Sequence, residues 1–173
     1  MKNPSVRIKT NYGSMEAELF KQEAPNTVAN FLSYVENGFY ENTLFHRVMV
    51  NFVIQGGGLN PGLYQKKSDK PIQNEATNGL KNEKFTLSMA RLPDPHSATS
   101  QFFINMADND FLDYTGGDNF GYCVFGRLNE GANIAIAISE APTEDRAGFQ
   151  NVPTHDIVIE TVELLSVEKG QEP

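Results

Sequence analysis

The sequence lacks tryptophan altogether and has a single cysteine, Cys123, in 173 residues. One cysteine cannot form an internal disulfide, so disulfide-stabilised secreted folds are excluded and a reducing compartment is expected. No apolar run approaches the roughly 18 residues that a membrane span requires, and the N-terminus lacks the apolar stretch of a signal peptide. Basic residues nowhere form a run, and 14 Lys and Arg against 22 Asp and Glu give a formal net charge of −8. We therefore expect a cytoplasmic protein with neither nucleic acid nor membrane as its partner.

What the chain does contain is the composition of an ordinary globular domain. Hydrophobic residues make up 39% and charged residues 21% of the sequence, close to the averages for folded proteins. The length suits one domain with a sizeable core, and no repeat or linker divides the chain. We expect a single domain over residues 1–173, with a polar tail at 168–173, and we expect it to be a monomer.

Short segments with period-two or continuous apolar patterns predict that much of the chain forms β-strands. Residues 6–10 and 15–19 alternate on either side of the turn Asn11-Tyr12-Gly13, which is typical of a β-hairpin. Further strands are expected in these segments: 43–48, 52–55, 85–90, 101–105, 121–126 and 157–167. Residues 59–84 show no periodicity, and a segment of this length without elements is usually functional or mobile.

Two segments have the spacing of helices. Apolar residues recur at helical spacing between Val28 and Val35, preceded by the capping residues Pro25-Asn26-Thr27 and followed by Gly38 as a stop. Residues 132–139 predict a second, shorter helix, although their alternating Ile and Ala fit a strand equally well. Strands and helices do not alternate, so a parallel sheet of βαβ units is a poor fit. The pattern favours a mainly β fold, an antiparallel sheet closed into a barrel with helices covering its ends.

Motifs for metal-dependent and hydrolytic chemistry are missing. None of the histidines has a cysteine or carboxylate at metal-ligand spacing, so no metal site is expected. These histidines are His46, His96 and His155. Ser97 and Ser100 lie outside any G-x-S-x-G motif and have no dedicated base nearby in sequence, which supports a serine hydrolase only weakly.

Motifs for cofactor binding and thiol chemistry are missing as well. Gly56-Gly57-Gly58 is not followed by the Lys and Ser or Thr of a phosphate-binding loop. Cys123 lies in an apolar strand and is interpreted as a small core residue rather than a nucleophile. We expect no cofactor.

Three polar residues stand out because they lie in strands that are otherwise rich in phenylalanine. Arg47 follows Phe45-His46, Gln55 ends a strand after Phe52, and Gln101 precedes Phe102-Phe103. Strand alternation alone would place any one of them on the solvent face. Three such strands together favour an apolar pocket with a few hydrogen-bonding groups.

At these residues the sequence resembles the cyclophilins, a family of peptidyl-prolyl cis–trans isomerases, and in particular their bacterial cytosolic members. The resemblance runs from Val6 to Val167. It is carried by several motifs in the family's order: Phe45-His46-Arg47-Val48, Phe52-Val53-Ile54-Gln55-Gly56-Gly57, Asn74-Glu75-Ala76, Leu87-Ser88-Met89-Ala90, His96-Ser97-Ala98-Thr99-Ser100-Gln101-Phe102-Phe103-Ile104 and Val124-Phe125-Gly126. It implies a closed eight-stranded antiparallel β-barrel capped by two α-helices. It also implies that the chain accelerates rotation about X-Pro bonds in peptides and in folding proteins.

The resemblance assigns roles to residues of this chain. Arg47 would be the catalytic residue. Phe52, Phe103 and Leu112 would form the pocket for the proline ring. Gln55 would bind the substrate backbone, Ala90 and Arg91 would line the site of the preceding residue, and Gln101 would complete the polar edge.

Four substrate-binding positions depart from residues frequent in the family. These positions are Val53, Arg91, Phe111 and Tyr122, where Met, Asn, Trp and His respectively are frequent. The departures leave the role of Arg47 unaffected but predict a pocket of different shape at its rim. Because Phe111 offers no indole N–H, the resemblance predicts weak binding of cyclosporin.

Two other classes of function stay open at this stage. The chain would be a proline-peptide binding module or holdase if isomerisation were incidental, although intact Arg47, Phe52, Gln55 and Phe103 argue against a dead site. A hydrolase that uses Ser100 or His96 is the other alternative.

Overall fold

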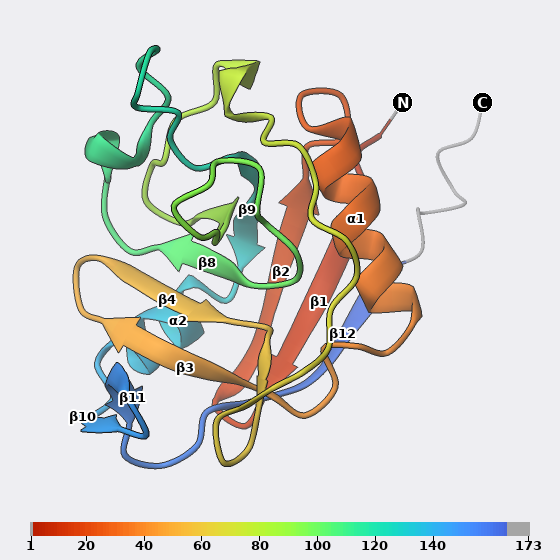
Figure 1. Ribbon diagram of the computed structural model, residues 1–173. Coiled ribbons are helices and arrows are strands. Elements are labelled where there is room, and N and C mark those ends of the chain that lie inside the picture. Colours follow the sequence, from red (N-terminus) through yellow and green to blue (C-terminus); the bar gives the residue numbers. More distant parts are fainter. Residues whose placement is uncertain (1, 166–173) are drawn as a thin grey trace.

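Eight strands close into an antiparallel barrel in the computed structural model, which describes residues 2–165 (Figure 1). Around the barrel the strand order is β1-β12-β3-β4-β8-β7-β9-β2. The barrel strands are β1 (Ser5–Thr10), β2 (Gly13–Leu19), β3 (Thr43–Met49), β4 (Val53–Gly56), β7 (Thr86–Met89), β8 (Phe102–Asn105), β9 (Val124–Glu130) and β12 (Val158–Leu165). With two α-helices, this confirms the predicted capped eight-stranded barrel.

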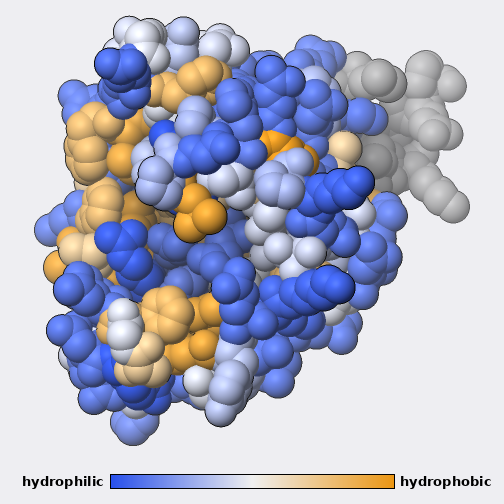
Figure 2. All heavy atoms as spheres, in the orientation of Figure 1, coloured by the Kyte–Doolittle hydropathy of each residue, from blue (hydrophilic) through white to orange (hydrophobic). Residues whose placement is uncertain are grey.

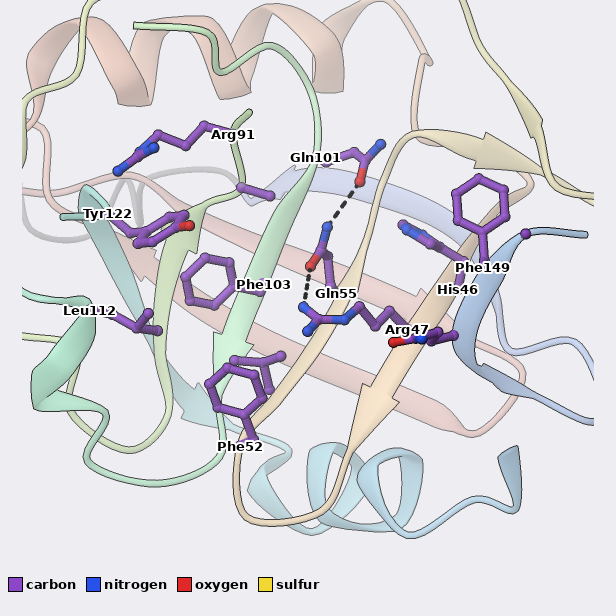
Figure 3. A pocket seen from close by; sticks show the side chains of 14 residues that line it. His46, Arg47, Phe52, Gln55, Arg91, Gln101, Phe103, Leu112, Tyr122 and Phe149 are labelled. Atoms are coloured by element: carbon purple, nitrogen blue, oxygen red, sulfur yellow. Dashed lines mark hydrogen bonds between the residues drawn. The ribbon is translucent and has the colours of Figure 1, made fainter. Parts of the chain in front are cut away.

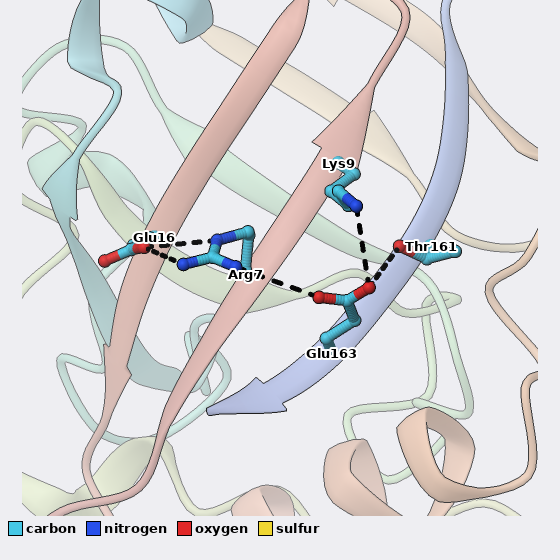
Figure 4. A network of polar contacts seen from close by, with 5 residues as sticks. All are labelled: Arg7, Lys9, Glu16, Thr161 and Glu163. Atoms are coloured by element: carbon cyan, nitrogen blue, oxygen red, sulfur yellow. Dashed lines mark hydrogen bonds and ion pairs between the residues drawn. The ribbon is translucent and has the colours of Figure 1, made fainter. Parts of the chain in front are cut away.

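The period-two pattern of the first hairpin separates a buried face from a charged one. Val6 and Ile8 of β1 point into the core and are fully buried. On the outer face Arg7 pairs with Glu16 of β2 at 2.9 Å and with Glu163 of β12 at 3.9 Å (Figure 4). These ion pairs are partly exposed to solvent and contribute little stability. Their location shows that this wall of the barrel faces solvent.

Helix α1 (Pro25–Glu36) confirms the predicted first helix, but its N-terminus is capped differently from the expectation. Pro25 occupies the first turn, while the N-cap residue is Ala24, whose side chain makes no capping hydrogen bond. Instead the carboxylate of Glu75 accepts hydrogen bonds from the backbone N–H of Thr27 at 2.7 Å and of Asn26 at 3.4 Å. The orphan donors of the first turn are thus satisfied by a distant acidic residue.

Helix α2 (Ala132–Ser139) settles the ambiguity of that segment in favour of a helix. Gly131 precedes it with φ of +85°, and a Cβ there would lie 2.6 Å from the Ser14 carbonyl oxygen. Ala135 and Ile138 are fully buried against the barrel. Among residues 2–165, no helix is long and apolar enough to span a membrane.

The segment 59–84, expected to lack elements, contains only small ones: β5 (Leu59–Asn60), β6 (Tyr64–Gln65) and the 3-10 turn η1 (Ala76–Asn78). It is nevertheless anchored, because Asn74, Ala76 and Asn82 are buried. A second 3-10 turn, η2, spans Asp110–Leu112.

A hairpin that was not predicted is formed by β10 (Thr143–Arg146) and β11 (Phe149–Pro153). The closing strand was expected over 157–167, of which 166–167 lie outside the described residues, as does the predicted tail 168–173.

The interior of the barrel is aromatic. Phe31 of α1 meets Phe102 edge-on at 5.5 Å between ring centroids and Phe125 at 5.2 Å. Cys123 lies in the same core, and its Sγ is 3.6 Å from the Thr27 hydroxyl. Burial raises the pKa of its thiol to about 11, because a thiolate is disfavoured in apolar surroundings. Its interpretation as a core residue is confirmed.

Candidate active site

Polar and aromatic side chains line a cleft of about 570 Å³ on the outer face of β3, β4 and β8. Figure 2 shows the molecule from this side, with hydrophobic and hydrophilic side chains around a hollow in its surface. The lining residues are His46, Arg47, Phe52, Val53, Gln55, Ala90, Arg91, Gln101, Phe103, Leu112, Tyr122, Gly148, Phe149 and Gln150. The cleft therefore has an apolar body and several polar groups, the usual make-up of a ligand site.

A bulge in β3 explains how two consecutive residues of one strand face the same cleft. The pairing of β3 with β4 shifts between Phe45 and Arg47, so that His46 is the extra residue. Phe45 and Val48 consequently both point into the core, whereas His46 and Arg47 both reach the outer face. Bulges often redirect side chains in this way next to active sites.

Arg47, Gln55 and Gln101 form one chain of hydrogen bonds across the cleft (Figure 3). The Arg47 Nη1 donates to Gln55 Oε1 at 3.2 Å, and Gln55 Nε2 donates to Gln101 Oε1 at 3.1 Å. Gly58 permits this arrangement, because a Cβ at that position would lie 2.7 Å from Gln101 Nε2. The guanidinium is thereby oriented while most of its five N–H donors stay available.

The apolar body of the cleft lies beside this chain. Phe103 of β8 meets Tyr122 edge-on at 5.7 Å, and the Arg47 guanidinium carbon is 5.7 Å from the ring centroid of Phe52. Leu112 and Val53 complete this part of the lining. Figure 3 shows Phe52, Phe103, Leu112 and Tyr122 gathered on one side of Gln55. A small apolar ring fits such a recess.

A buried polar network holds the Leu112 wall in place. The Asn82 side-chain amide donates to Leu112 O at 3.1 Å and to Asp113 Oδ1 at 2.9 Å. Asn82 Oδ1 in turn accepts hydrogen bonds from Ser88 of β7 and Asn105 of β8. Because satisfied buried networks are rigid, they fix η2 relative to the barrel.

His46 stays neutral beside Arg47. It is buried, with 4% of its surface exposed, and burial together with the positive charge of Arg47 lowers its pKa to about 4. Its Nδ1 has no hydrogen-bond partner among the described residues, and its ring meets Phe149 of β11 edge-on at 5.8 Å. His46 is thus unsuited to act as a general base near neutral pH.

Arg91 lies at one end of the cleft, next to Ala90. Its guanidinium carbon lies 4.4 Å from the ring centroid of Tyr122, and its Nε donates to Gly121 O at 3.1 Å. A neighbouring groove shares Ala90, Arg91 and Gln101 with the main cleft. At Arg91 the cleft therefore adjoins this second groove.

The structure brings all but one of the eleven predicted site residues to this cleft. The ten are Arg47, Phe52, Val53, Gln55, Ala90, Arg91, Gln101, Phe103, Leu112 and Tyr122. Phe111 is the exception: it is 62% exposed and lies outside the lining, with its ring stacked on Phe52 at 5.8 Å.

Sequence reasoning missed four lining residues, namely His46, Gly148, Phe149 and Gln150. The only signal for His46 was its place beside Arg47. The other three belong to the hairpin that no periodicity revealed.

The residues of the hydrolase alternative are not assembled for catalysis. Ser100 is buried and lies outside the cleft lining, and His96 accepts a hydrogen bond from the backbone N–H of Asn74 through its Nδ1. Within residues 2–165, no group of three or more His, Cys, Asp and Glu side chains is placed to hold a metal ion. The oriented guanidinium beside an apolar recess suits a reaction in which no covalent bond breaks.

Comparison with known proteins agrees with this chemistry. Residues 5–164 match the family described as "Cyclophilin type peptidyl-prolyl cis-trans isomerase/CLD". The chain is 49% identical over 163 residues to peptidyl-prolyl cis-trans isomerase cyp18 of Streptomyces antibioticus, covering 93% of this chain and 98% of that protein. It is also 49% identical over 159 residues to peptidyl-prolyl cis-trans isomerase B of Escherichia coli, covering 91% and 97% respectively.

Solved structures give the same result. A cyclophilin-type isomerase of Cryptosporidium parvum superposes with a TM-score of 0.82 at 30% identity, over 95% of this chain and 99% of that one. A second crystal structure of the same protein, obtained in the presence of the dipeptide Ala-Pro, superposes with a TM-score of 0.81, over 94% and 99%. The chain therefore belongs to the cyclophilins and is a peptidyl-prolyl cis–trans isomerase.

Proposed function

We propose that this isomerase acts in the cleft on β3, β4 and β8, with Arg47 as the catalytic residue and the Phe52, Phe103 and Leu112 recess as the proline pocket. The observation that carries the proposal is the side-by-side placement of a fixed guanidinium and an apolar recess. Gln55 binds the substrate backbone, and Gln101 completes the polar edge of the cleft. Ala90 and Arg91 line the site of the residue before the proline, while Val53 and Tyr122 complete the wall.

Prolyl rotation breaks no covalent bond, so it requires no nucleophile or general base, and an apolar recess with a hydrogen-bond donor suits it. Rotation about a peptide bond has a barrier of ~18–20 kcal/mol, because amide resonance is lost at the perpendicular geometry. In the twisted state the prolyl nitrogen regains its lone pair while the carbonyl loses dipole. An apolar recess favours this less dipolar amide, and Arg47 donates to the nitrogen or holds the carbonyl.

The size of the effect limits what Arg47 contributes. A hydrogen bond from a charged donor contributes on the order of 1.5–3 kcal/mol net, which corresponds to roughly a 10- to 100-fold effect on rate. Any larger acceleration comes from desolvation in the recess and from clamping one side of the bond.

The first test is exchange spectroscopy by NMR on an Ala-Pro peptide with the parent protein and the Arg47→Ala variant. We expect the parent to accelerate exchange and Arg47→Ala to lower turnover at least tenfold, with its circular dichroism unchanged. The matched control is Arg7→Ala on the far wall of the barrel, which should retain the parent rate. A folded Arg47→Ala variant that isomerises at the parent rate would exclude the role of Arg47.

The same experiment separates the alternative functions. Line broadening without faster exchange would indicate a proline-peptide binding module or holdase. New peptide signals would indicate cleavage. The Cryptosporidium parvum crystal structure obtained in the presence of the dipeptide Ala-Pro supports the choice of probe.

The setting of this activity is also part of the proposal. The substrates are proline-containing peptides and folding proteins in the cytoplasm, in keeping with one buried free thiol. The chain functions as one domain over 1–173 and as a monomer, in keeping with a barrel whose own strands leave no unpaired edge. Cyclosporin binds weakly.

A further inference from the structure

The cleft carries positively charged side chains and no acidic ones, although the protein as a whole is acidic. The chain has a formal net charge of −8, yet no Asp or Glu lines the cleft or the adjoining groove, whereas Arg47 and Arg91 line the cleft. Neither arginine forms an ion pair with a carboxylate in the described part of the chain, where the ion pairs involve Arg7, Lys9 and Arg146. Two unpaired guanidinium groups in one recess concentrate positive potential there.

The proposed function assigns Arg47 to the rotating bond but gives the Arg91 guanidinium no role in that step. Arg91 is held from three sides: its Nε donates to Gly121 O at 3.1 Å, and its Nη1 donates to Leu92 O at 2.9 Å and to Pro93 O at 3.4 Å. Its planar group also stacks on Tyr122, with 4.4 Å from the guanidinium carbon to the ring centroid. The side chain is therefore ordered before any substrate arrives, which lowers the entropy cost of using it.

One nitrogen of this group, Nη2 with its two N–H donors, is left over. The Arg91 Nη2 makes no hydrogen bond to residues 2–165, and the side chain is half-buried where the cleft meets the neighbouring groove. Asp94, which is close in sequence, uses its Oδ1 to accept from the backbone N–H of His96 and does not pair with Arg91. An ordered guanidinium with a free N–H edge and no counter-charge is a carboxylate-binding group.

We propose that Arg91 is a specificity-determining residue that favours substrates with an acidic side chain directly before the proline. The inference rests on the proposed function, because it places the preceding residue beside Ala90 and Arg91. Since Arg91 touches the residue before the proline and not the rotating bond, its effect appears in KM rather than in kcat.

The test compares two peptides of equal size, one with Glu-Pro and one with Gln-Pro, by NMR exchange spectroscopy at low ionic strength. Uncatalysed rates are measured for each peptide and subtracted. A partly exposed ion pair contributes modestly, so we expect the parent to prefer Glu-Pro about twofold to fivefold in kcat/KM. Adding salt to ~1 M should reduce this preference, because the Debye length falls to about 3 Å.

Three variants distinguish a direct role from a general one. Arg91→Gln should bring the Glu-Pro to Gln-Pro ratio to about one, and Arg91→Lys should restore part of it because the charge is kept. Arg7→Gln, on the opposite wall, removes the same unit of charge, from −8 to −9, and should keep the parent ratio. A purely structural role for Arg91 would change both peptides by the same factor.

Each outcome has a distinct meaning. A parent ratio near one, or a ratio unchanged in Arg91→Gln, would overturn the role of Arg91 while leaving the isomerase function intact. Failure of the parent to accelerate either peptide would instead overturn the proposed function of the cleft.

Discussion

Phe111, which packs on the cleft residue Phe52, is the residue whose identity most directly predicts a change in ligand binding. Its ring is 62% exposed at the rim of the cleft and stacks on Phe52 at 5.8 Å. A phenylalanine gives a ligand an apolar face but no hydrogen-bond donor, whereas an indole N–H would supply one. We expect Phe111→Trp to bind cyclosporin more tightly, by roughly two- to tenfold, the effect of one net hydrogen bond. Titration calorimetry on the two proteins measures the difference.

The control for this prediction is Phe111→Leu, which changes the same side chain without adding a donor and should not strengthen binding. Equally tight binding of cyclosporin by the parent and by Phe111→Trp would show that the missing indole is irrelevant at this rim.

The polar residues of the cleft were predictable individually because Arg47, Gln55 and Gln101 contrast with the phenylalanines around them. His46 was not, since regular alternation places it on the opposite face from Arg47. Only the bulge between Phe45 and Arg47 brings both to one side. A bulge depends on pairing with another strand, and its position is not encoded in the periodicity of β3 alone.

The N-terminus of α1 depends on an acidic residue that lies 48 positions away in the sequence. The Glu75 carboxylate accepts from the backbone N–H and the hydroxyl of Thr27, each at 2.7 Å. A negative charge at this end also interacts favourably with the helix dipole. We expect Glu75→Gln to lower the free energy of unfolding by about 1–2 kcal/mol, measured by urea denaturation.

Glu83→Gln is the matched control, because Glu83 is exposed in the same long segment and should change stability by no more than about 0.5 kcal/mol. Equal stabilities of Glu75→Gln and Glu83→Gln would mean that solvent satisfies the helix end as well as the carboxylate does.

The sequence predicts helices and strands better than it predicts the contacts and turns at their ends. Helical spacing identified α1, whose Phe31 and Val28 face the core, but no local pattern pointed to Glu75. The β10–β11 hairpin was not predicted, because Thr143–Arg146 are all exposed and show no apolar alternation. Its turn is formed by Ala147 and Gly148, both with positive φ, at +54° and +83°. The usual sequence signal for such a turn is Asn-Gly, which is missing here. Its strands are specified by packing of β11 on β3 rather than by propensity.

The inner face of the barrel stabilises the fold, whereas its outer face carries the proposed site. Its interior is filled by apolar and aromatic side chains such as Phe31, Phe102 and Phe125, whereas the proposed catalytic groups lie on the outside of β3, β4 and β8. Adjacent residues of one strand, Phe102 inside and Phe103 outside, serve the two purposes. A closed barrel resists distortion because each of its strands is hydrogen-bonded on both sides, which suits a site that works by holding groups in place.

Cys123 reports on the integrity of the whole barrel. It is 3% exposed, and burial raises the pKa of its thiol to about 11, so the native protein presents almost no reactive thiolate at pH 7.5. Because global stability is typically ~5–15 kcal/mol, labelling by a thiol reagent should be at least about a thousandfold slower than at Val50→Cys in a Cys123→Ser background, Val50 being 58% exposed. Urea should accelerate the labelling of Cys123 as steeply as it unfolds the protein. Fast labelling without denaturant, or labelling that urea barely affects, would show that the core next to α1 opens locally while the rest of the barrel stays folded.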